Sequence, residues 1–580
     1  MALTNRKNSN KIFFNMRERI IILGAGVMQG PAIRVARELG LFAVVADGNP
    51  NAPCASMADQ FAHIDLKDKE GIETFARSLL NDGGLAGIMT AGTDFSATVA
   101  WVAEKLGLPG IPYEAALNAS DKARMRACFD KAKLPSPPFT SITRDDTLDD
   151  ISLSFPLVVK PVDNMGGRGC RRVDAIEELR DATADALRFS RSGRAIVEAF
   201  MDGPEFSVDA IVYHGEITIC GLADRHIFFP PYFIEMGHTM PTNFPGEQQA
   251  ALLETFCAGV RALGLAGPES IGAAKGDIKL TAQGPMIGEI AARLSGGYMS
   301  GWTYPYASGV EPIRAAILAA VGRKPDNLAP LKNWTSAERA FISIPGTVKA
   351  ITGIEAARNL PHVRDLFLRA AEGDKVSFPQ NNVSKCGNII AAAPTRAAVV
   401  EAAETAARSI LIRLDPADGE TAAFLSAYTA FPPDAFSLPP ALKDALARLP
   451  ETTLTSVRPH TEDTEKIKGL NYNTPSPSSV SSVPPVPPCE CILLFPFPAF
   501  TTSNLTDYMG RTVAESLRAV REMTGLLLPI IAPENGNSAP NSTDNKGSFL
   551  ESSFLGRSFW AALVRGGYQG AVYYIDKIRV

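Results

Sequence analysis

The chain has 580 residues, of which 46% are hydrophobic and 21% are charged, and its formal net charge is −5. This composition is typical of a soluble protein with several domains, and it provides no basic field that would attract nucleic acid or an anionic membrane. Residues 1–19 contain only the short apolar run Ile12–Phe14, too short for a secretory signal or a membrane span, so we expect a cytoplasmic protein. The eight cysteines are scattered, and the close pair Cys489 and Cys491 lacks the further ligands of a zinc site.

The first part of the chain predicts alternating strands and helices. A buried-strand run at 19–23 is followed by a glycine turn and a helix, and the alternation continues to about residue 106. Such alternation predicts a doubly wound parallel sheet over residues 1–115, whose ligands would lie at the carboxyl ends of the strands. The expected strands are 19–23, 42–46 and 87–90, and the expected helices are 31–39, 70–80 and 95–106.

The glycine turn also allows a second interpretation. Gly24 and Gly26 follow a strand and Asp47 ends the next one, which is half of a dinucleotide-binding pattern with its third glycine displaced to Gly30. The same glycines serve any tight turn between a strand and a helix. Dinucleotide binding therefore stays open as an alternative.

A glycine loop follows the strand predicted at 155–161. Lys160 lies near the end of that strand, and the loop 163–169 contains Gly166, Gly167 and Gly169. Glycines let backbone N–H groups turn toward phosphate oxygens, and a lysine adds a mobile charge. The loop has no Gly-Lys-Ser/Thr and is not a P-loop. The alternative interpretation is an ordinary hairpin turn with a surface lysine.

A β-hairpin is predicted farther along, with apolar runs on both sides of Thr281–Gly284. Each run carries one acid, Asp277 and Glu289. Paired strands would bring the two carboxylates together, and Mg²⁺ takes oxygen ligands of this kind. The alternative is two acids on a solvent-facing surface.

Between the loop and the hairpin, Glu198 and Glu205 lie seven residues apart across a Gly-Pro turn. With this stretch, the order and spacing of the motifs over roughly residues 19–325 resemble the ATP-grasp superfamily. The resemblance implies that Lys122 and Lys160 contact the α- and β-phosphates of ATP. It also implies that Glu198 lies beside adenine and that Glu205 accepts the ribose hydroxyls. The flap glycines of the family correspond to Gly166, Gly167 and Gly169.

The same resemblance assigns Asp277 and Glu289 to Mg²⁺, and Arg293 to the reacting phosphoryl group or acyl phosphate. Lys275 is predicted as a second catalytic cation. The chain departs from the family pattern at Ala291, where an asparagine is usual, so a third metal ligand is missing or replaced.

The stretch 223–241 is rich in rings and contains Glu235 and His238 in a Glu-x-x-His pattern. Two ligands at this spacing are weak support for zinc. The stretch is similar to the substrate loop of ATP-grasp amino-acid ligases, so Glu235 and His238 are predicted substrate residues. The alternative is an ordered Pro-rich loop with surface histidines. Three aromatic residues downstream would wall the pocket or belong to the core: Tyr298, Trp302 and Tyr304.

The C-terminal part is predicted as three segments. Residues 331–420 resemble a small α/β lid domain, to which we assign no catalytic residue. Residues 421–490 are predicted as a helical and Pro/Ser-rich linker, and 491–580 as a partly disordered tail. Within the lid, we expect strands at 340–344, 365–369 and 387–392 and a helix at 395–412. Within the tail, we expect residues 505–530 and 553–580 to fold. The second of these segments is a candidate to dock on the main body.

The fold class expected from these observations is α/β. A doubly wound N-terminal domain, as in carbamoyl-phosphate synthase large-chain-like proteins, precedes an ATP-grasp fold at 116–330 and the lid. The resemblance implies an ATP- and Mg²⁺-dependent ligase that activates a carboxylate as an acyl phosphate for an amine, releasing ADP and phosphate. The alternatives are a bicarbonate-dependent or carbamoyl-phosphate-type enzyme and a nucleotide-binding regulator without turnover. The expected partners are a small carboxylate and amine, without nucleic acid or membrane, and a homodimer is left open.

Overall fold

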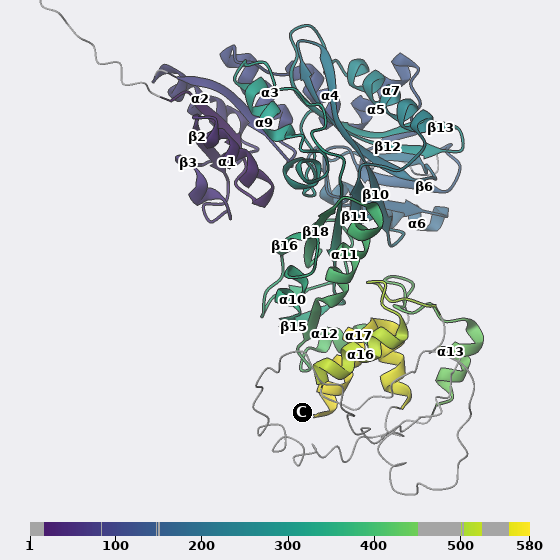
Figure 1. Ribbon diagram of the computed structural model, residues 1–580. Helices are drawn as coiled ribbons and strands as arrows, with labels where there is room; N and C mark the ends of the chain where they lie inside the picture. The colour runs from purple at the N-terminus through teal and green to yellow at the C-terminus, as the bar shows by residue number, and fades with distance from the viewer. Residues whose placement is uncertain are drawn as a thin grey trace, which may run out of the picture. The chain divides into compact units, whose positions relative to one another are not determined.

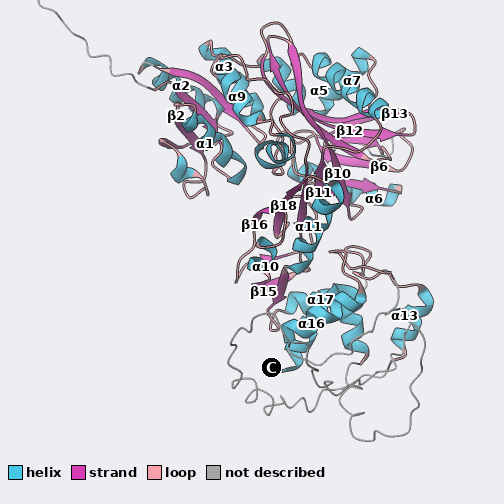
Figure 2. Cartoon of the chain, viewed as in Figure 1, coloured by secondary structure: helices cyan, strands magenta, loops and turns pink. Residues whose placement is uncertain are grey.

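The computed structural model describes residues 17–449 except 83, 147, 149, 150 and 428, together with residue 500 and residues 504–524 and 556–579. The chain divides into two compact units, coloured along the sequence in Figure 1 and by secondary structure in Figure 2. Unit 1 comprises Met1–Phe341, Ile354–Arg369 and Pro379–Ser409, and unit 2 comprises Ile342–Gly353, Ala370–Phe378 and Ile410–Val580. Cys489, Cys491 and the Pro-rich segment 451–490 lie outside the described residues. The predicted domain boundaries stay predictions.

Unit 1 begins with the predicted parallel sheet. Its strand order is β3-β2-β1-β4, and every pairing is parallel. Strand β1 is buried on both faces because apolar clusters pack on either side of the sheet, which explains its unbroken Ile-Leu run. The strands are β1 (Arg19–Leu23), β2 (Phe42–Asp47), β3 (Gln60–His63) and β4 (Leu85–Thr90), and the helices are α1 (Gly30–Glu38), α2 (Lys69–Asn81), α3 (Ser96–Leu106) and α4 (Tyr113–Ser120).

The glycine turn after β1 is filled by the protein itself. Gln29 Oε1 accepts from Gly26 N at 3.0 Å, and a Cβ on Gly24 would lie 3.0 Å from the Gln29 side chain. Asp47 accepts hydrogen bonds from Ala25 N at 2.7 Å and from Asn49 N at 2.8 Å. The groups that would hold a pyrophosphate and a ribose are thus used internally, which disfavours the dinucleotide alternative.

A four-stranded antiparallel sheet carries the glycine flap. The strand order is β5-β8-β6-β7, and the loop between β6 and β7 contains the flap glycines. Helix α6 packs its apolar stripe on this sheet, and Asp121 caps helix α5 by accepting from Ala123 N and Arg124 N. The elements are α5 (Lys122–Ala132), β5 (Phe139–Ile142), β6 (Leu157–Pro161), β7 (Arg171–Val173), α6 (Ile176–Phe189) and β8 (Ala195–Ala199).

An eight-stranded antiparallel sheet forms the centre of unit 1, in the order β13-β12-β9-β10-β11-β14-β18-β16. Helices α5 and α7 lie over the β12–β13 end, and α11 packs on β14 and β18 (Figure 1). The elements are β9 (Glu205–Tyr213), β10 (Glu216–Phe228), β11 (Ile234–Met240), α7 (Gly246–Ala262), β12 (Ile271–Thr281), β13 (Gly284–Ala291), β14 (Thr335–Phe341), β16 (Val363–Leu368), β18 (Gly387–Ala393) and α11 (Arg396–Ser409).

Shorter helical elements complete unit 1. A π-helical turn at Met299–Thr303 leads into α8 (Tyr304–Ser308) and α9 (Pro312–Ala320), and α10 (Ile354–Arg358) precedes β16. Strands β14, β16 and β18 continue the large sheet, so part of the predicted lid is continuous with the predicted ATP-grasp part of the chain rather than a sheet of its own.

Unit 2 combines a small sheet with helices. Strands β15 (Gly346–Thr352), β17 (Lys375–Val376) and β19 (Leu411–Leu414) are accompanied by α12 (Gly419–Ser426), α13 (Pro440–Ala447), α16 (Val513–Thr524) and α17 (Arg557–Arg579). Their core is apolar and includes Phe436, Phe559 and Trp560. The helix predicted at 395–412 ends at Ser409 because the apolar residues that follow form β19. Among the described helices, none has the length and apolar character to cross a bilayer.

Candidate active site

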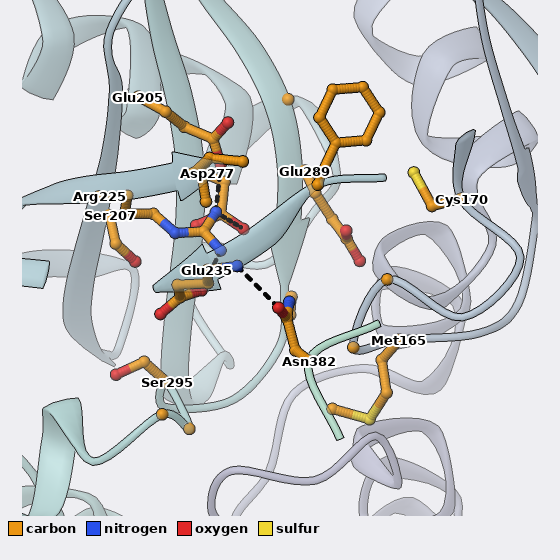
Figure 3. Close-up of a pocket in the computed structure, with 18 of the residues that line it drawn as sticks. Met165, Cys170, Glu205, Ser207, Arg225, Glu235, Asp277, Glu289, Ser295 and Asn382 are labelled. Atoms are coloured by element: carbon orange, nitrogen blue, oxygen red, sulfur yellow. Dashed lines mark hydrogen bonds and ion pairs between the residues drawn. The ribbon is translucent and has the colours of Figure 1, made fainter. Parts of the chain in front are cut away.

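A cavity of about 510 Å³ in unit 1 gathers most of the predicted site residues (Figure 3). Its walls come from the flap, the eight-stranded sheet and the loop after β13. Two predicted residues, Gly169 and His238, are not among the residues that line it. The predicted residues that do line it are Lys122, Lys160, Gly166, Gly167, Glu198, Glu205, Glu235, Lys275, Asp277, Glu289 and Arg293.

The predicted hairpin places its two acids opposite each other. Asp277 and Glu289 are Cα partners in the β12–β13 pairing, with an irregularity just after Asp277. Asp277 Oδ2 forms ion pairs with Lys275 and with Arg225 NH1, the latter at 2.9 Å. Asp277 Oδ1 is buried and accepts no hydrogen bond from any described residue. One carboxylate oxygen is therefore committed and the other is open to a ligand.

Glu289 lies in a strongly cationic environment. Its side chain is 34% exposed, and Lys122 Nζ lies 3.4 Å from its carboxylate. Burial alone would raise the pKa of Glu289, but the neighbouring cations, led by Lys122 and Lys275, outweigh burial and lower it to about 2. The carboxylate is ionised at neutral pH. Ala291, which also lines the cavity, offers no oxygen ligand.

The two predicted phosphate lysines are held from different elements. Lys122, the first residue of α5, donates to Asn164 O of the flap at 2.8 Å. Lys160, on β6, lies 2.6 Å from Glu198 Oε2. Both ammonium groups therefore face the cavity beside the flap.

Glu198 is a buried anchor. It is 2% exposed, and its second oxygen accepts from Arg126 Nε at 2.8 Å. Burial would raise the pKa of Glu198, but Arg126 and Lys160 reverse the effect and hold the pKa below its usual value. Both carboxylate oxygens are therefore engaged. The chain that follows Glu198 brings Phe200 to the cavity wall, stacked on Phe233 with ring centroids 6.2 Å apart.

Arg225, to which the sequence analysis gave no role, is the central cation of the site. From β10 it donates to Glu205 on β9 and to Glu235 on β11, besides its contact with Asp277 (Figure 3). Burial would lower the pKa of Arg225, but the three carboxylates raise it above its usual value. Its side chain thus ties the predicted ribose, metal and substrate residues into one network. In the sequence, Arg225 lies between Asp224 and His226 and does not stand out, because its partners depend on strand pairing.

His238 lies behind the cavity wall rather than on it. It is fully buried, with Nδ1 at 3.2 Å from Glu338 Oε2 and 3.8 Å from Glu235 Oε1, and Nε2 at 3.1 Å from Thr303 Oγ1. Burial would lower the pKa of His238, but the two carboxylates raise it. Glu338, on β14, is a buried acid that the sequence analysis missed. Its carboxylate forms, with Glu235 and His238, a group of three potential metal-ligand atoms that lie within 4.8 Å of one another. Within this group, Glu235 is already paired with Arg225.

The segment 363–393 contributes cavity residues that were not predicted. Lys385 Nζ donates to Glu235 O at 2.7 Å, and Asn382 Oδ1 accepts from Glu235 N at 2.8 Å. Asn382 N donates to Gly166 O of the flap at 2.9 Å. This segment therefore joins the flap to the strand that carries Glu235. Arg369 and Asn388 also line the cavity.

Of the three aromatic residues predicted to wall the pocket or belong to the core, one lines the cavity. Tyr298 lines the cavity and stacks on Phe367 of β16, with ring centroids 4.4 Å apart. Burial raises the pKa of Tyr298 to about 12, so its hydroxyl stays protonated at neutral pH. Trp302 packs edge-on against Tyr298, and Tyr304 is fully buried in the core; neither lines the cavity.

The charge of the cavity is unbalanced. Within the described part of the chain, nine cationic and five anionic side chains line it. All five carboxylates are in ion pairs. By contrast, four of the cations form no ion pair with a described carboxylate: Arg168, Arg293, Arg369 and Lys385. Such an excess of positive charge favours a polyanionic ligand.

The comparisons with known proteins agree with the family resemblance of the sequence motifs. Residues 153–300 match the model of the ATP-grasp domain, and residues 340–415 match the model of the L-amino acid ligase C-terminal domain 2. The crystal structure of an L-amino acid ligase from Bacillus licheniformis superposes with a TM-score of 0.62 and 21% identity, covering 69% of this chain and 99% of that one. At this identity, the likeness establishes a shared fold.

Two curated relatives extend over much of the chain. The uncharacterized protein y4rH of Sinorhizobium fredii is 26% identical over 412 residues, covering 69% of this chain and 84% of that protein. Carnosine synthase 1 of Gallus gallus is 25% identical over 404 residues, covering 64% of this chain and 43% of the synthase. The chain thus spans less than half the length of that synthase.

Proposed function

We propose that this chain, a member of the ATP-grasp superfamily, is an ATP-dependent ligase that activates a carboxylate as an acyl phosphate and joins it to an amine. The observation that carries the proposal is the cavity in which two opposed acids, Asp277 and Glu289, face two lysines beside a glycine flap. The match of residues 340–415 to an amino-acid ligase domain supports an amino acid as one substrate.

ATP binds, in this proposal, between the flap and the large sheet. Lys122 and Lys160 contact its phosphates, and the flap adds backbone N–H groups. Gly166 and Gly167 have φ values of 71° and 74°, which turn successive N–H groups in a way that other residues adopt only with strain. The adenine lies by the chain that follows Glu198, and the ribose lies by Glu205.

The described residues fit Mg²⁺ beside the phosphates. Asp277 Oδ1 is a buried oxygen without a donor, and Glu289 is ionised, which is the hard oxygen donor set that Mg²⁺ prefers. When bound, Mg²⁺ neutralises phosphate charge and orients the γ-phosphate. Because Ala291 supplies no oxygen, Asp277 and Glu289 would be the two protein ligands that hold the ion.

The reaction proceeds in two displacements. A carboxylate oxygen of the first substrate attacks the γ-phosphorus, the bond to the β-phosphate oxygen breaks, and ADP leaves. Arg293 faces the transferring group with an Nε that donates to no described residue, and Lys275 adds positive charge; both stabilise the transition state electrostatically. The amine then attacks the carbonyl carbon, phosphate leaves with the former carboxylate oxygen, and the nitrogen loses a proton to a base.

The substrate end of the cavity contains Glu235, with His238 behind it. Glu235 is held from three sides, by Arg225 at its carboxylate and by Asn382 and Lys385 at its backbone. A carboxylate fixed in this way is suited to orient a cationic amino group. The contact between Asn382 and the flap would keep water away from the acyl phosphate.

The experiment is ADP release from Mg-ATP with the twenty proteinogenic L-amino acids, added singly and in pairs, with Glu289→Gln as the inactive control. Turnover that a pair stimulates and the control lacks supports the ligase. Turnover that needs bicarbonate supports a carboxylating enzyme instead, and tight ATP binding without ADP release under any condition supports a regulator.

A further inference from the structure

Asn388 is a cavity residue that the proposed reaction leaves without a role. It lies on β18, is 1% exposed, and lines the cavity. Its Nδ2 donates to Glu338 Oε1, and Glu338 in turn faces His238. The Asn388 side chain therefore lies between Glu338, which is buried behind the cavity wall, and the cavity itself.

The orientation of the Asn388 amide follows from its partner. An ionised carboxylate only accepts hydrogen bonds, so the amide must turn its NH₂ group toward Glu338. Its Oδ1 is then left as the free end. This oxygen is buried and accepts no hydrogen bond from any described residue. A buried acceptor in a cavity wall without a protein donor requires a donor from water or from a ligand.

The ligands already placed in the cavity do not supply that donor. The other unpartnered atoms on described cavity residues are Asp277 Oδ1, Arg293 Nε and Ser207 Oγ, and Mg²⁺ and the transferring phosphoryl group would satisfy the first two. The phosphates of ATP only accept hydrogen bonds, and its donors, the ribose hydroxyls and the adenine amino group, are placed in the proposed function at Glu205 and at the chain after Glu198. The ligand left to supply the donor is therefore the substrate, and water takes its place when no substrate is bound.

The surroundings of Asn388 indicate what kind of donor fits. Its Cα partner across β16 is Phe367, which stacks on Tyr298, so Asn388 lies next to the aromatic wall. The carboxylates connected to it are those of Glu338 and, through His238, Glu235. An amide oxygen accepts a stronger hydrogen bond from a charged donor than from a neutral one, which favours an ammonium group.

We propose that Asn388 is a substrate-binding residue whose Oδ1 accepts a hydrogen bond from a primary ammonium group. The ammonium belongs to the substrate whose carboxylate is activated, and Glu235 balances its charge. This inference rests on the proposed ligase function. Its consequence is discrimination between an amino acid and the same acid without its amino group.

The test combines the variant Asn388→Ala with two forms of the substrate. The amino acid that best stimulates ADP release is compared with its desamino analogue, in which hydrogen replaces the α-amino group. We expect kcat/KM for the amino acid to fall about 10- to 100-fold, as for loss of a charge-assisted hydrogen bond. The value for the analogue and the KM for ATP should change less than about twofold. Asn359→Ala, an exposed position after α10, is the matched control.

Three results overturn the inference. They are an equal loss for both substrate forms, a wild-type protein that uses the analogue as well as the amino acid, and no effect of the variant. The comparison of substrate forms on wild-type protein needs no variant, so misfolding of Asn388→Ala cannot hide the answer.

Binding separates this inference from the proposed function. Calorimetry measures the affinity of the same twenty amino acids for the protein loaded with Mg²⁺ and a non-hydrolysable ATP analogue. Amino-acid binding that depends on Asn388, without ADP release from ATP, would support the subsite and overturn the ligation. An absence of amino-acid binding would overturn the subsite.

Discussion

Arg225 NH1 lies 2.9 Å from Asp277 Oδ2, two strands away across the large sheet, while Asp277 Oδ1 has no donor among the described residues (Figure 3). The arginine neutralises one oxygen of the acid and leaves the other open. Because the same guanidinium bonds Glu205 and Glu235, the open oxygen is held in a fixed position. In the proposed function, this arrangement prepares Asp277 for a cation that binds together with the nucleotide.

Removing the charge of Asp277 should therefore weaken the response to magnesium. In Asp277→Asn, the Mg²⁺ concentration for half-maximal ADP release should rise roughly 100-fold, since even indirect changes around a metal cost 10- to 100-fold. The measurement is a Mg²⁺ titration at fixed ATP. Glu216→Gln, which changes an exposed acid, is the control. An unchanged Mg²⁺ response in Asp277→Asn would remove this residue from the metal site.

Glu198 should stabilise the fold in a pH-dependent way. Glu198→Gln leaves Arg126 and Lys160 without their anion and should lower the free energy of unfolding at pH 7 by about 3–5 kcal/mol. Because the pKa of Glu198 is below its usual value of 4.5, the stabilisation is present above that pH and is lost as pH falls through the lowered pKa. Urea unfolding of wild type and variant should thus converge below pH 4.5. A difference that does not shrink in acid would contradict this assignment.

Cys170 provides a test of the proposed nucleotide site. It lines the cavity beside the flap, and burial raises its pKa to about 11. Its alkylation by iodoacetamide should therefore be slow at pH 7, rise roughly tenfold per pH unit up to pH 10, and be suppressed by Mg-ATP. Peptide mass spectrometry reads the modification, with Cys128, outside the cavity, as an internal control. Equal labelling of Cys170 with and without Mg-ATP would place the nucleotide elsewhere.

Asn382 connects the flap to the substrate strand through Gly166 O and Glu235 N. Asn382→Ala keeps the backbone N–H that donates to Gly166 O but loses the side-chain acceptor of Glu235 N, so the segment that contacts the flap is no longer tied to β11. The flap contact should loosen, so that water reaches the acyl phosphate and ADP forms without ligated product. The measurement is the ratio of ADP to product. That ratio should be close to one in wild type and in Asn359→Ala, and clearly higher in Asn382→Ala. A ratio that stays near one would leave Asn382 as a purely structural contact.

The sequence predicts best where the information is local. The limits of β1 follow from an unbroken buried run, and the short turn at Thr281–Gly284 brings Asp277 and Glu289 close together on paired strands. Their direct Cα pairing also needs the irregularity after Asp277, which the sequence pattern does not show. The parallel N-terminal sheet follows from the alternation of strands and helices. Strand β3 was not predicted because Gln60–His63 is short and carries no clear apolar pattern.

The parts of the fold and of the site that were not predicted depend on contacts between distant segments of the chain. Arg225 is opposite Glu205 and one strand from Glu235 only because β9, β10 and β11 are neighbours. Asn382 and Asn388 reach the cavity because β16 and β18 join β14 at the end of the large sheet. A single sequence does not encode these pairings in its periodicity. The predicted helix at 395–412 was too long for a related reason. Leu411, Ile412 and Leu414 are apolar and would suit a helix or a strand, and their pairing with β15 makes them a strand.

The central claim is that a substrate carboxylate attacks the γ-phosphate of ATP. It is tested most directly with the preferred amino acid labelled with ¹⁸O in both carboxylate oxygens, its amine partner and Mg-ATP, followed by mass spectrometry of the released phosphate. The account predicts one ¹⁸O atom in each phosphate, because the carboxylate oxygen leaves with phosphorus when the amine attacks. Release of ADP with unlabelled phosphate would contradict the account.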